Sequence, residues 1–103
     1  MKQIINGKRY DTTTATEVAK WWNGLSYNDF GFCHERLFVT KNGNWFLEGE
    51  GGARSKYAQT RGTSQCGGGA IVPMTKDEAR GWLESKSDVL MIEKYFPEDV
   101  TDA

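Results

Sequence analysis

The chain reads LFVTKNGNWFLE over residues 37–48, and this stretch decides the fold. The first three residues favour extended backbone, and Asn42-Gly43 tolerates the positive φ angles of a tight hairpin turn. Successive side chains of a strand point to opposite faces. The stretch therefore predicts an antiparallel hairpin that carries Trp45 and Leu47 on one face and Phe46, Glu48 and Glu50 on the other.

Two further elements are expected before this hairpin. Residues 3–10 contain Asn6-Gly7 between short extended runs, which predicts another hairpin. Thr14 and Glu17 have the spacing of a capping box, and an apolar stripe at helical spacing follows. We therefore expect a short helix that ends at Asn23-Gly24 and buries Ala15, Val18, Ala19 and Trp22.

The second half of the chain predicts one short strand and two helices. Residues 70–72 favour a buried strand that ends at Pro73. A second capping box, Thr75 with Glu78, opens a helix with Ala79, Trp82 and Leu83 on its apolar face. Asp88 is expected to cap another helix, with a stripe of Val89, Ile92 and Phe96 that Pro97 ends. Residues 53–58 fit either a helical turn or a strand, and residues 62–69 favour a flexible loop because glycine dominates there.

The expected order is β-β-α-β-β-(β)-α-α. Tight turns join neighbouring strands, so the fold class is α+β, a small mainly antiparallel sheet with about three short helices packed on it. Residues 1–97 form a single domain in this interpretation, and residues 98–103 form a frayed acidic tail.

Composition excludes several functional classes. The chain has 103 residues and a net charge of −1, which is not the strong basic field of a typical nucleic-acid-binding protein. It has no apolar run of the ~20 residues that a membrane span needs, and no secretory leader, so we expect a cytoplasmic protein. Two cysteines and one histidine, without metal-ligand spacing, predict no disulfide scaffold, no zinc site and no cofactor.

Three groups of residues could carry chemistry, and each has a simpler interpretation. Cys33 and His34 are adjacent, so on a strand they point apart, and a packed thiol beside a surface histidine is expected. Cys66 could meet His34 only if its loop folded back. The glycine-rich region with Arg54, Lys56 and Arg61 could bind an anion. It contains neither the Walker motif nor the dinucleotide-binding fingerprint, the two glycine-rich motifs that bind phosphate groups. Glu48 and Glu50, with Glu35 on the partner strand, could share acid and base roles, but two exposed strand glutamates are typical of a solvated face.

The aromatic residues divide into an expected core and an expected surface. Trp22, Trp45, Phe46 and Trp82 lie on apolar stripes and are assigned to the core. Five other rings are candidates for a recognition surface, where Tyr, Trp and Arg carry most of the binding energy: Tyr10, Trp21, Tyr27, Phe30 and Tyr57.

Several motifs carry a family resemblance. They are INGKRYDT at residues 5–12, GNWFLEGEGGA at 43–53, SKY at 55–57 and IVPMT at 71–75. With these, the chain resembles a family of small, uncharacterised prokaryotic proteins that prophages, plasmids and other mobile elements often carry. The resemblance transfers no catalytic residue. It implies a protein that binds a host protein, as inhibitors of defence systems such as anti-CRISPR proteins do.

The sequence therefore predicts a non-catalytic protein-binding module rather than an enzyme. The interaction candidates are Tyr10, Trp21, Tyr27, Phe30, Glu48, Glu50, Arg54, Lys56, Tyr57 and Arg61. A first alternative is a nucleic-acid-binding protein that uses Arg9, Arg36, Arg54, Lys56 and Arg61 with Tyr57. A second is a ligand-binding domain or small enzyme around Glu48, Glu50 and the glycine-rich loop.

Overall fold

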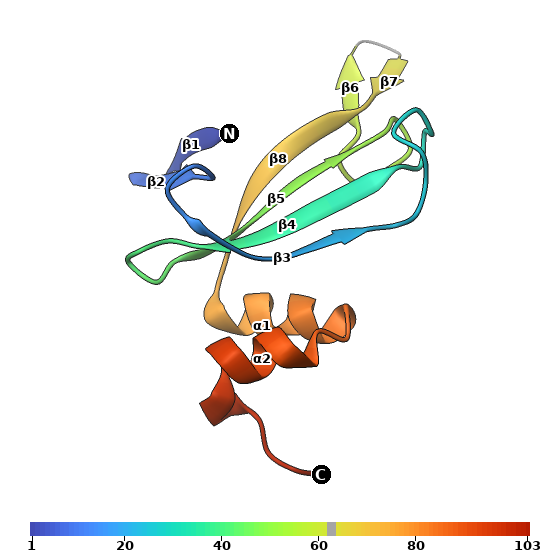
Figure 1. Ribbon diagram of the computed structural model, residues 1–103. Coiled ribbons are helices and arrows are strands. Elements are labelled where there is room, and N and C mark those ends of the chain that lie inside the picture. Colours follow the sequence, from blue (N-terminus) through green and yellow to red (C-terminus); the bar gives the residue numbers. More distant parts are fainter. Residues whose placement is uncertain (62–63) are drawn as a thin grey trace.

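A four-stranded antiparallel sheet forms the centre of the molecule (Figure 1). A computed structural model describes residues 1–61 and 64–103. In it, the strands lie in the order β3 (Thr16–Trp22), β4 (Cys33–Val39), β5 (Trp45–Gly51) and β8 (Gly68–Met74). Leu37 pairs with Leu47 across β4 and β5, as the sequence predicts. The α+β class and the mainly antiparallel sheet are confirmed.

Two small hairpins accompany the sheet. The first joins β1 (Lys2–Ile5) to β2 (Lys8–Asp11) through Asn6 and Gly7, whose φ angles of 51° and 78° confirm the predicted turn. The second pairs β6 (Gln59–Arg61) with β7 (Ser64–Cys66). β7 and the start of β8 replace most of the loop expected over residues 62–69, while residues 62 and 63 lie outside the described part.

The helix predicted over residues 14–22 is wrong, because β3 occupies that segment. A β-bulge between Glu17 and Ala19 explains the misleading pattern. The bulge shifts the register of β3, so the adjacent residues Val18 and Ala19 both contact the core, as neighbours on a helix stripe would. Trp22, assigned to the core from that stripe, is 54% exposed.

The two C-terminal helices were predicted correctly in place. α1 (Lys76–Ser85) begins at the Thr75 capping box, where the Thr75 Oγ1 accepts from the Glu78 amide at 3.1 Å and Glu78 Oε1 accepts from the Thr75 amide at 2.9 Å. Asp88 caps α2 (Val89–Tyr95) by accepting from the Met91 amide at 3.2 Å. Two α-helices are therefore present in the described residues, not three. No helix of these residues is both long and apolar enough to cross a membrane.

Three details near these helices differ from expectation. Pro73 does not end its strand, since β8 continues to Met74 at the edge of the sheet, where a missing N–H is tolerated. Val89 is exposed, so only Phe96 and part of Ile92 from that stripe reach the core. Pro97 opens a 3-10 turn, η1 (Pro97–Asp99), whose Asp99 lies 3.4 Å from Arg80.

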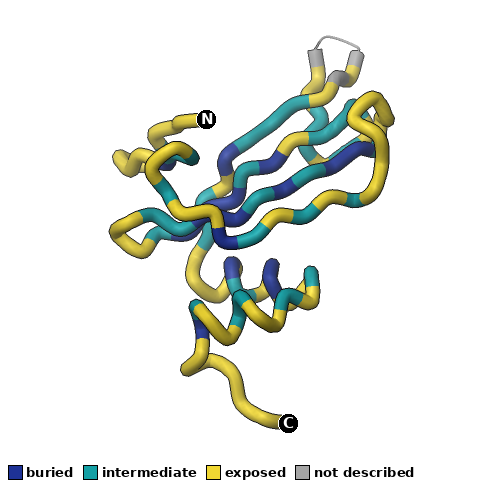
Figure 2. Tube along the Cα trace, in the orientation of Figure 1, coloured by how far each residue is buried: buried dark blue, intermediate teal, exposed yellow. Residues whose placement is uncertain are grey.

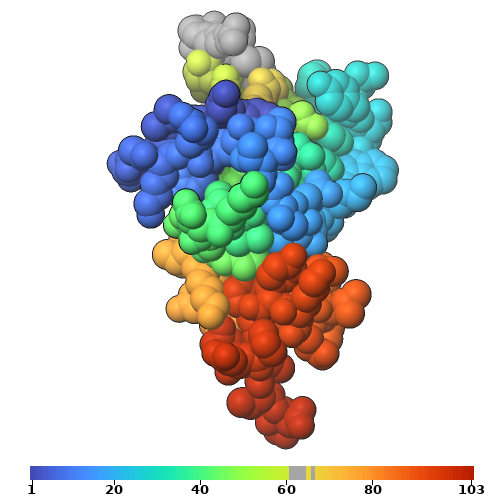
Figure 3. Space-filling view, turned by 60° about the vertical axis from the view of Figure 1, so that its left-hand side comes forward, coloured from blue at the N-terminus to red at the C-terminus, as the bar shows by residue number. Residues whose placement is uncertain are grey.

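The sheet is covered on both faces where consecutive residues are buried, as at residues 45–47 of β5, and the exposed segments in Figure 2 lie away from these positions. The helices cover one face, and Figure 3 shows them gathered at one end of the molecule. Their core comprises Val18, Leu37, Trp45, Leu47, Ala79, Trp82, Leu83 and Phe96. On the other face the N-terminal hairpin covers a smaller core of Tyr10, Phe38, Phe46 and Ile71. The rest of that second face is open.

Candidate functional site

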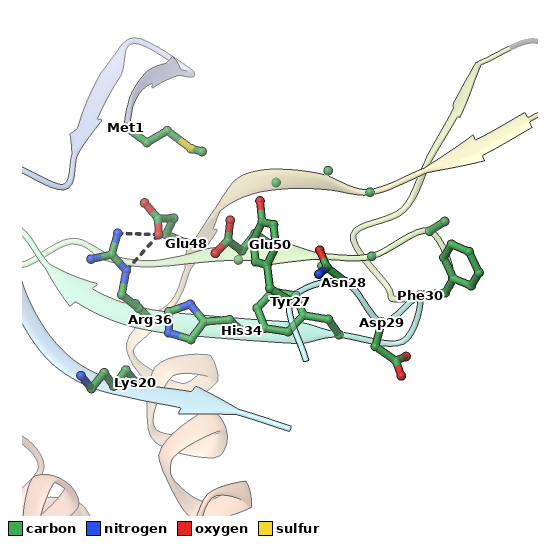
Figure 4. Close-up of a pocket in the computed structure, with 18 of the residues that line it drawn as sticks. Met1, Lys20, Tyr27, Asn28, Asp29, Phe30, His34, Arg36, Glu48 and Glu50 are labelled. Carbon is green, nitrogen blue, oxygen red and sulfur yellow. Dashed lines mark hydrogen bonds and ion pairs between the residues drawn. The ribbon is translucent and has the colours of Figure 1, made fainter. Parts of the chain in front are cut away.

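The open part of the sheet forms a groove of about 1090 Å³ (Figure 4). His34 and Arg36 of β4, with Glu48 and Glu50 of β5, form its floor. Alternation along the strands places these side chains on the face opposite the helices. Met1 lies at one end and glycines 67–69 border the β8 side. Glu48 and Glu50 share this face, as the sequence predicts.

The floor contains one satisfied ion pair and one free carboxylate. Arg36 donates from Nη2 and Nε to Glu48 Oε1 at 2.6 and 2.9 Å, and its Nη1 lies 3.4 Å from Glu17. The bond to Glu48 raises the pKa of Arg36 above its ordinary value. Glu50 is exposed, and no residue within 1–61 or 64–103 forms an ion pair or side-chain hydrogen bond with it. The free negative charge in the groove floor is therefore that of Glu50.

The loop between β3 and β4 forms the aromatic wall of the groove. Tyr27 is 74% exposed and Phe30 is 64% exposed. Asp29 stabilises the loop by accepting from the Gly31 amide at 2.8 Å, and the Arg54 amide donates to the Phe30 carbonyl at 2.7 Å. Both rings therefore stand on a tethered loop and face solvent.

A close backbone approach holds this wall against the end of β5. A Cβ at Gly52 would lie 2.5 Å from the Asp29 carbonyl oxygen and 2.6 Å from that of Phe30. No larger residue fits there without moving the loop. Gly52 therefore allows the loop backbone at Asp29 and Phe30 to lie directly against the end of β5.

A second hollow of about 600 Å³ adjoins the groove at the β3 edge. It shares Lys20, Phe32, His34 and Glu50 with the groove and adds Trp21 and Trp22. Trp22 donates its indole N–H to the Leu25 carbonyl at 2.7 Å. The aromatic surface thus continues from the wall to the edge of the sheet.

The opposite face holds a buried carboxylate, Glu35, which has no exposed surface. Its Oε2 accepts from the Tyr57 hydroxyl and lies 2.6 Å from Lys56 Nζ, while Oε1 accepts from Trp82 Nε1 at 3.1 Å. Lys86 Nζ is 3.9 Å from Oε1. Burial alone would raise the pKa of Glu35, but the bonds from Lys56, Tyr57 and Trp82 outweigh it and hold the pKa below its usual value.

Tyr57 reaches Glu35 by packing against the back of the groove floor. A Cβ at Gly49 would collide with the Tyr57 ring. Burial and the neighbouring Glu35 both raise the pKa of Tyr57, so its hydroxyl stays protonated and donates. This arrangement is structural support for the floor rather than part of the groove.

The predicted interaction candidates separate into several places. Tyr27, Phe30, Glu48 and Glu50 line the groove. Tyr10 is buried in the smaller core, which corrects its assignment to a surface. Trp21 is half-buried, with Lys86 Nζ 3.7 Å from its ring centre. Lys56 and Tyr57 contact Glu35, Arg54 lies 5.9 Å from the Phe30 ring centre, and the Arg61 side chain lies outside the described residues.

Among the side chains that the structure describes, the basic set expected for nucleic acid does not gather on one surface. Arg9 belongs to the N-terminal hairpin, and Arg36 lies in the groove between two glutamates. Lys56 and Tyr57 lie on the other face of the sheet.

Cys33 and His34 point to opposite faces, as predicted. Cys33 is buried, and burial raises the pKa of its thiol. His34 lines the groove. The Cys66 side chain lies outside the described residues, so its meeting with His34 stays untested. Among the described residues, no group of three His, Cys, Asp or Glu side chains could hold a metal ion.

Sequence reasoning missed the roles of Glu35 and Trp22. Glu35 alternates with Leu37 and Val39 on β4, and this spacing could have placed it on the buried face. Nothing in the sequence marks the bulge that releases Trp22 from the core.

Comparisons with protein families, with curated proteins and with solved structures give no match for this chain. The resemblance to proteins of mobile elements therefore stays an expectation.

Proposed function

We propose that this chain is a protein-binding module and that the groove is its contact surface. The observation that carries the proposal is the combination of exposed rings and a free carboxylate in one groove. Tyr27 lies beside Glu50, and Phe30 lies farther along the same loop (Figure 4). Exposed aromatic anchors next to a polar floor are typical of the energetic centre of a protein interface.

The charge of the groove favours a basic segment of the partner. Four carboxylates line it, from Glu17, Asp29, Glu48 and Glu50, against two cationic side chains, from Lys20 and Arg36. Arg36 is already neutralised by its two glutamates. A partner segment with Lys or Arg side chains therefore matches the groove better than an acidic one.

The same charge argues against the nucleic-acid alternative. A phosphate backbone would meet Glu50 and Asp29 in the groove, where Arg36 is already paired with Glu17 and Glu48. A ligand-binding role has more support, because Glu48, Glu50 and glycines 67–69 border one groove. We keep a small cationic ligand as the second candidate function.

The resemblance noted in the sequence gives the partner a context. If the chain acts as proteins of mobile elements do, the basic segment belongs to a host bacterial complex, and a defence system is one such target. In this proposal the chain acts by occupying that segment and catalyses no reaction.

The experiment compares capture by groove variants with capture by a matched surface variant. The immobilised chain is exposed to nuclease-treated lysates of several bacteria. Tyr27→Ala with Phe30→Ala, and separately Glu50→Lys, should lose at least about 90% of a stoichiometric partner, since interface anchors contribute about 2 kcal/mol or more each.

The control is Leu90→Ala, which removes an exposed apolar side chain from α2, outside the groove. It should capture the partner as the original chain does. Equal capture by all variants, capture only from a parallel lysate that has not been treated with nuclease, or no partner in any lysate would each contradict the proposal.

A further inference from the structure

One row of side chains crosses the sheet on its open face. Trp22 of β3 pairs with His34 of β4, and His34 pairs with Glu50 of β5. Directly paired residues of antiparallel strands point to the same face and lie about 5 Å apart. Trp22 and Glu50 therefore stand about 10 Å apart on either side of His34, and all three line the hollow at the β3 edge.

Trp22 and Glu50, at the two ends of this row, are both accessible to a ligand. The Trp22 ring is half exposed, yet its bond to the Leu25 carbonyl at 2.7 Å fixes its orientation. The Glu50 carboxylate has no ionic or hydrogen-bonded partner among the described residues. Its neighbour across β8 is Gly69, which has no side chain to fill the space beside it. An aromatic ring held in place and a free carboxylate thus face the same hollow.

We propose that this hollow receives an arginine side chain of the partner, with the guanidinium stacked on Trp22 and paired with Glu50. The inference rests on the proposed function and names the residue type that the groove recognises. A guanidinium is flat and weakly hydrated, so it stacks on an indole, and its N–H groups match a carboxylate. Lysine offers a compact ammonium that cannot use both surfaces in this way.

The positive charge of Lys20 distinguishes a cationic ligand from an anionic one. It lines the same hollow, and no residue in the described ranges 1–61 and 64–103 forms an ion pair with it. A cationic ligand is repelled by Lys20, whereas an anionic one is attracted. Removal of this charge should therefore strengthen the binding of arginine and weaken the binding of any acidic group.

The test is a titration with three capped pentapeptides, Gly-Gly-X-Gly-Gly, in which X is Arg, Lys or Glu. Binding is followed by NMR through the Trp22 indole N–H and the backbone amides of His34 and Glu50. The Arg peptide should give saturable shifts at these positions, the Lys peptide should bind more weakly, and the Glu peptide should not bind.

The variants address each end of the row. Glu50→Gln should weaken the Arg peptide by on the order of tenfold, because a charged hydrogen bond is lost. Trp22→Leu should weaken it by about threefold or more through the loss of stacking. Lys20→Ala should strengthen it by about twofold, in keeping with modest surface electrostatics. Glu98→Gln, on η1, is the matched control and should change nothing.

Equal affinity for Arg and Lys, binding of the Glu peptide, or weaker Arg binding in Lys20→Ala would overturn the assignment. So would the absence of saturable shifts at Trp22. If these results occur while partner capture still depends on Tyr27 and Phe30, the groove binds a protein by other contacts. If the Arg peptide binds but no partner is captured, the subsite stands and the proposed function fails.

Discussion

Glu35 and Glu50 lie on neighbouring strands of one sheet and have opposite environments. Glu35 is fully buried on the helix face, where Tyr57, Trp82 and Lys56 occupy its oxygens. Glu50 is exposed on the groove face, and its carboxylate has no ionic or hydrogen-bonded partner in the described residues. The Glu35 carboxylate therefore stabilises the fold, whereas the Glu50 carboxylate is available to a ligand.

The largest expected effect comes from Glu35→Ala. The substitution leaves Trp82 and the Tyr57 hydroxyl without their acceptor and opens a cavity in the core. We expect the free energy of unfolding to fall by about 3–4 kcal/mol, measured by urea denaturation. Glu50→Ala is the matched control and should change it by no more than about 0.5 kcal/mol. Similar losses of free energy of unfolding in both variants would show that the two carboxylates do not differ in their contribution to stability.

Gly49→Ala tests the contact that supports the floor from behind. The added methyl group would collide with the Tyr57 ring and push the hydroxyl away from Glu35. We expect a loss of about 2–3 kcal/mol in the free energy of unfolding. The control is Gly81→Ala in α1, where a Cβ meets nothing within 4 Å and helix propensity should add about 0.5–1 kcal/mol. A neutral Gly49→Ala variant would contradict the packing described.

Tyr57→Phe removes only the hydroxyl that donates to Glu35. The expected loss is about 1–2 kcal/mol, because a buried charged acceptor loses one of its donors. Tyr27→Phe, on the exposed wall, should leave stability unchanged in the same thermal or urea assay. Equal behaviour of the two variants would show that Glu35 does not depend on Tyr57.

The smallest expected effect is on the pH dependence of stability. The folded state holds the pKa of Glu35 below its unfolded value, so its contribution is complete above roughly pH 4.3 and is lost as pH falls through the folded pKa. Its charged or titratable neighbours are Lys56, Lys86, Tyr57 and Cys33.

Urea denaturation between about pH 2 and pH 6 measures this effect. The free energy of unfolding should fall further for the original chain than for Glu35→Gln as the solution becomes acidic. Glu50→Gln should follow the original chain. If the free energy of unfolding changes with pH in the same way for the original chain and for Glu35→Gln, the ionised Glu35 does not stabilise the folded state.

Local signals in the sequence predicted the elements that depend on neighbouring residues. The turns at Asn6-Gly7 and Asn42-Gly43 and the cap at Thr75 are satisfied within a few residues, so their patterns are reliable. The capping-box spacing of Thr14 and Glu17 is the exception, because a strand, β3, forms there in place of a helix. Its apolar spacing follows from a bulge that forms only against β4, and the helix propensity of the isolated segment does not decide the outcome.

The groove was only partly predictable for a related reason. Alternation along β5 is sufficient by itself to place Glu48 and Glu50 on one face. The partners of Glu35 come from residues 56, 57, 82 and 86, which are distant in the chain and meet only through packing. Contacts between residues so distant in the chain depend on the whole fold, and they cannot be predicted from the sequence pattern of one strand.

Consecutive pairing of β3, β4 and β5 gives the chain a short route to its folded state. Each of these strands is the next neighbour of the one before it, so two hairpins assemble them with little loss of chain entropy. β8 joins β5 only after the intervening segment has looped back, and α1 follows β8 directly. The three-stranded meander should therefore gain amide protection first in refolding experiments, with the helix layer docking last.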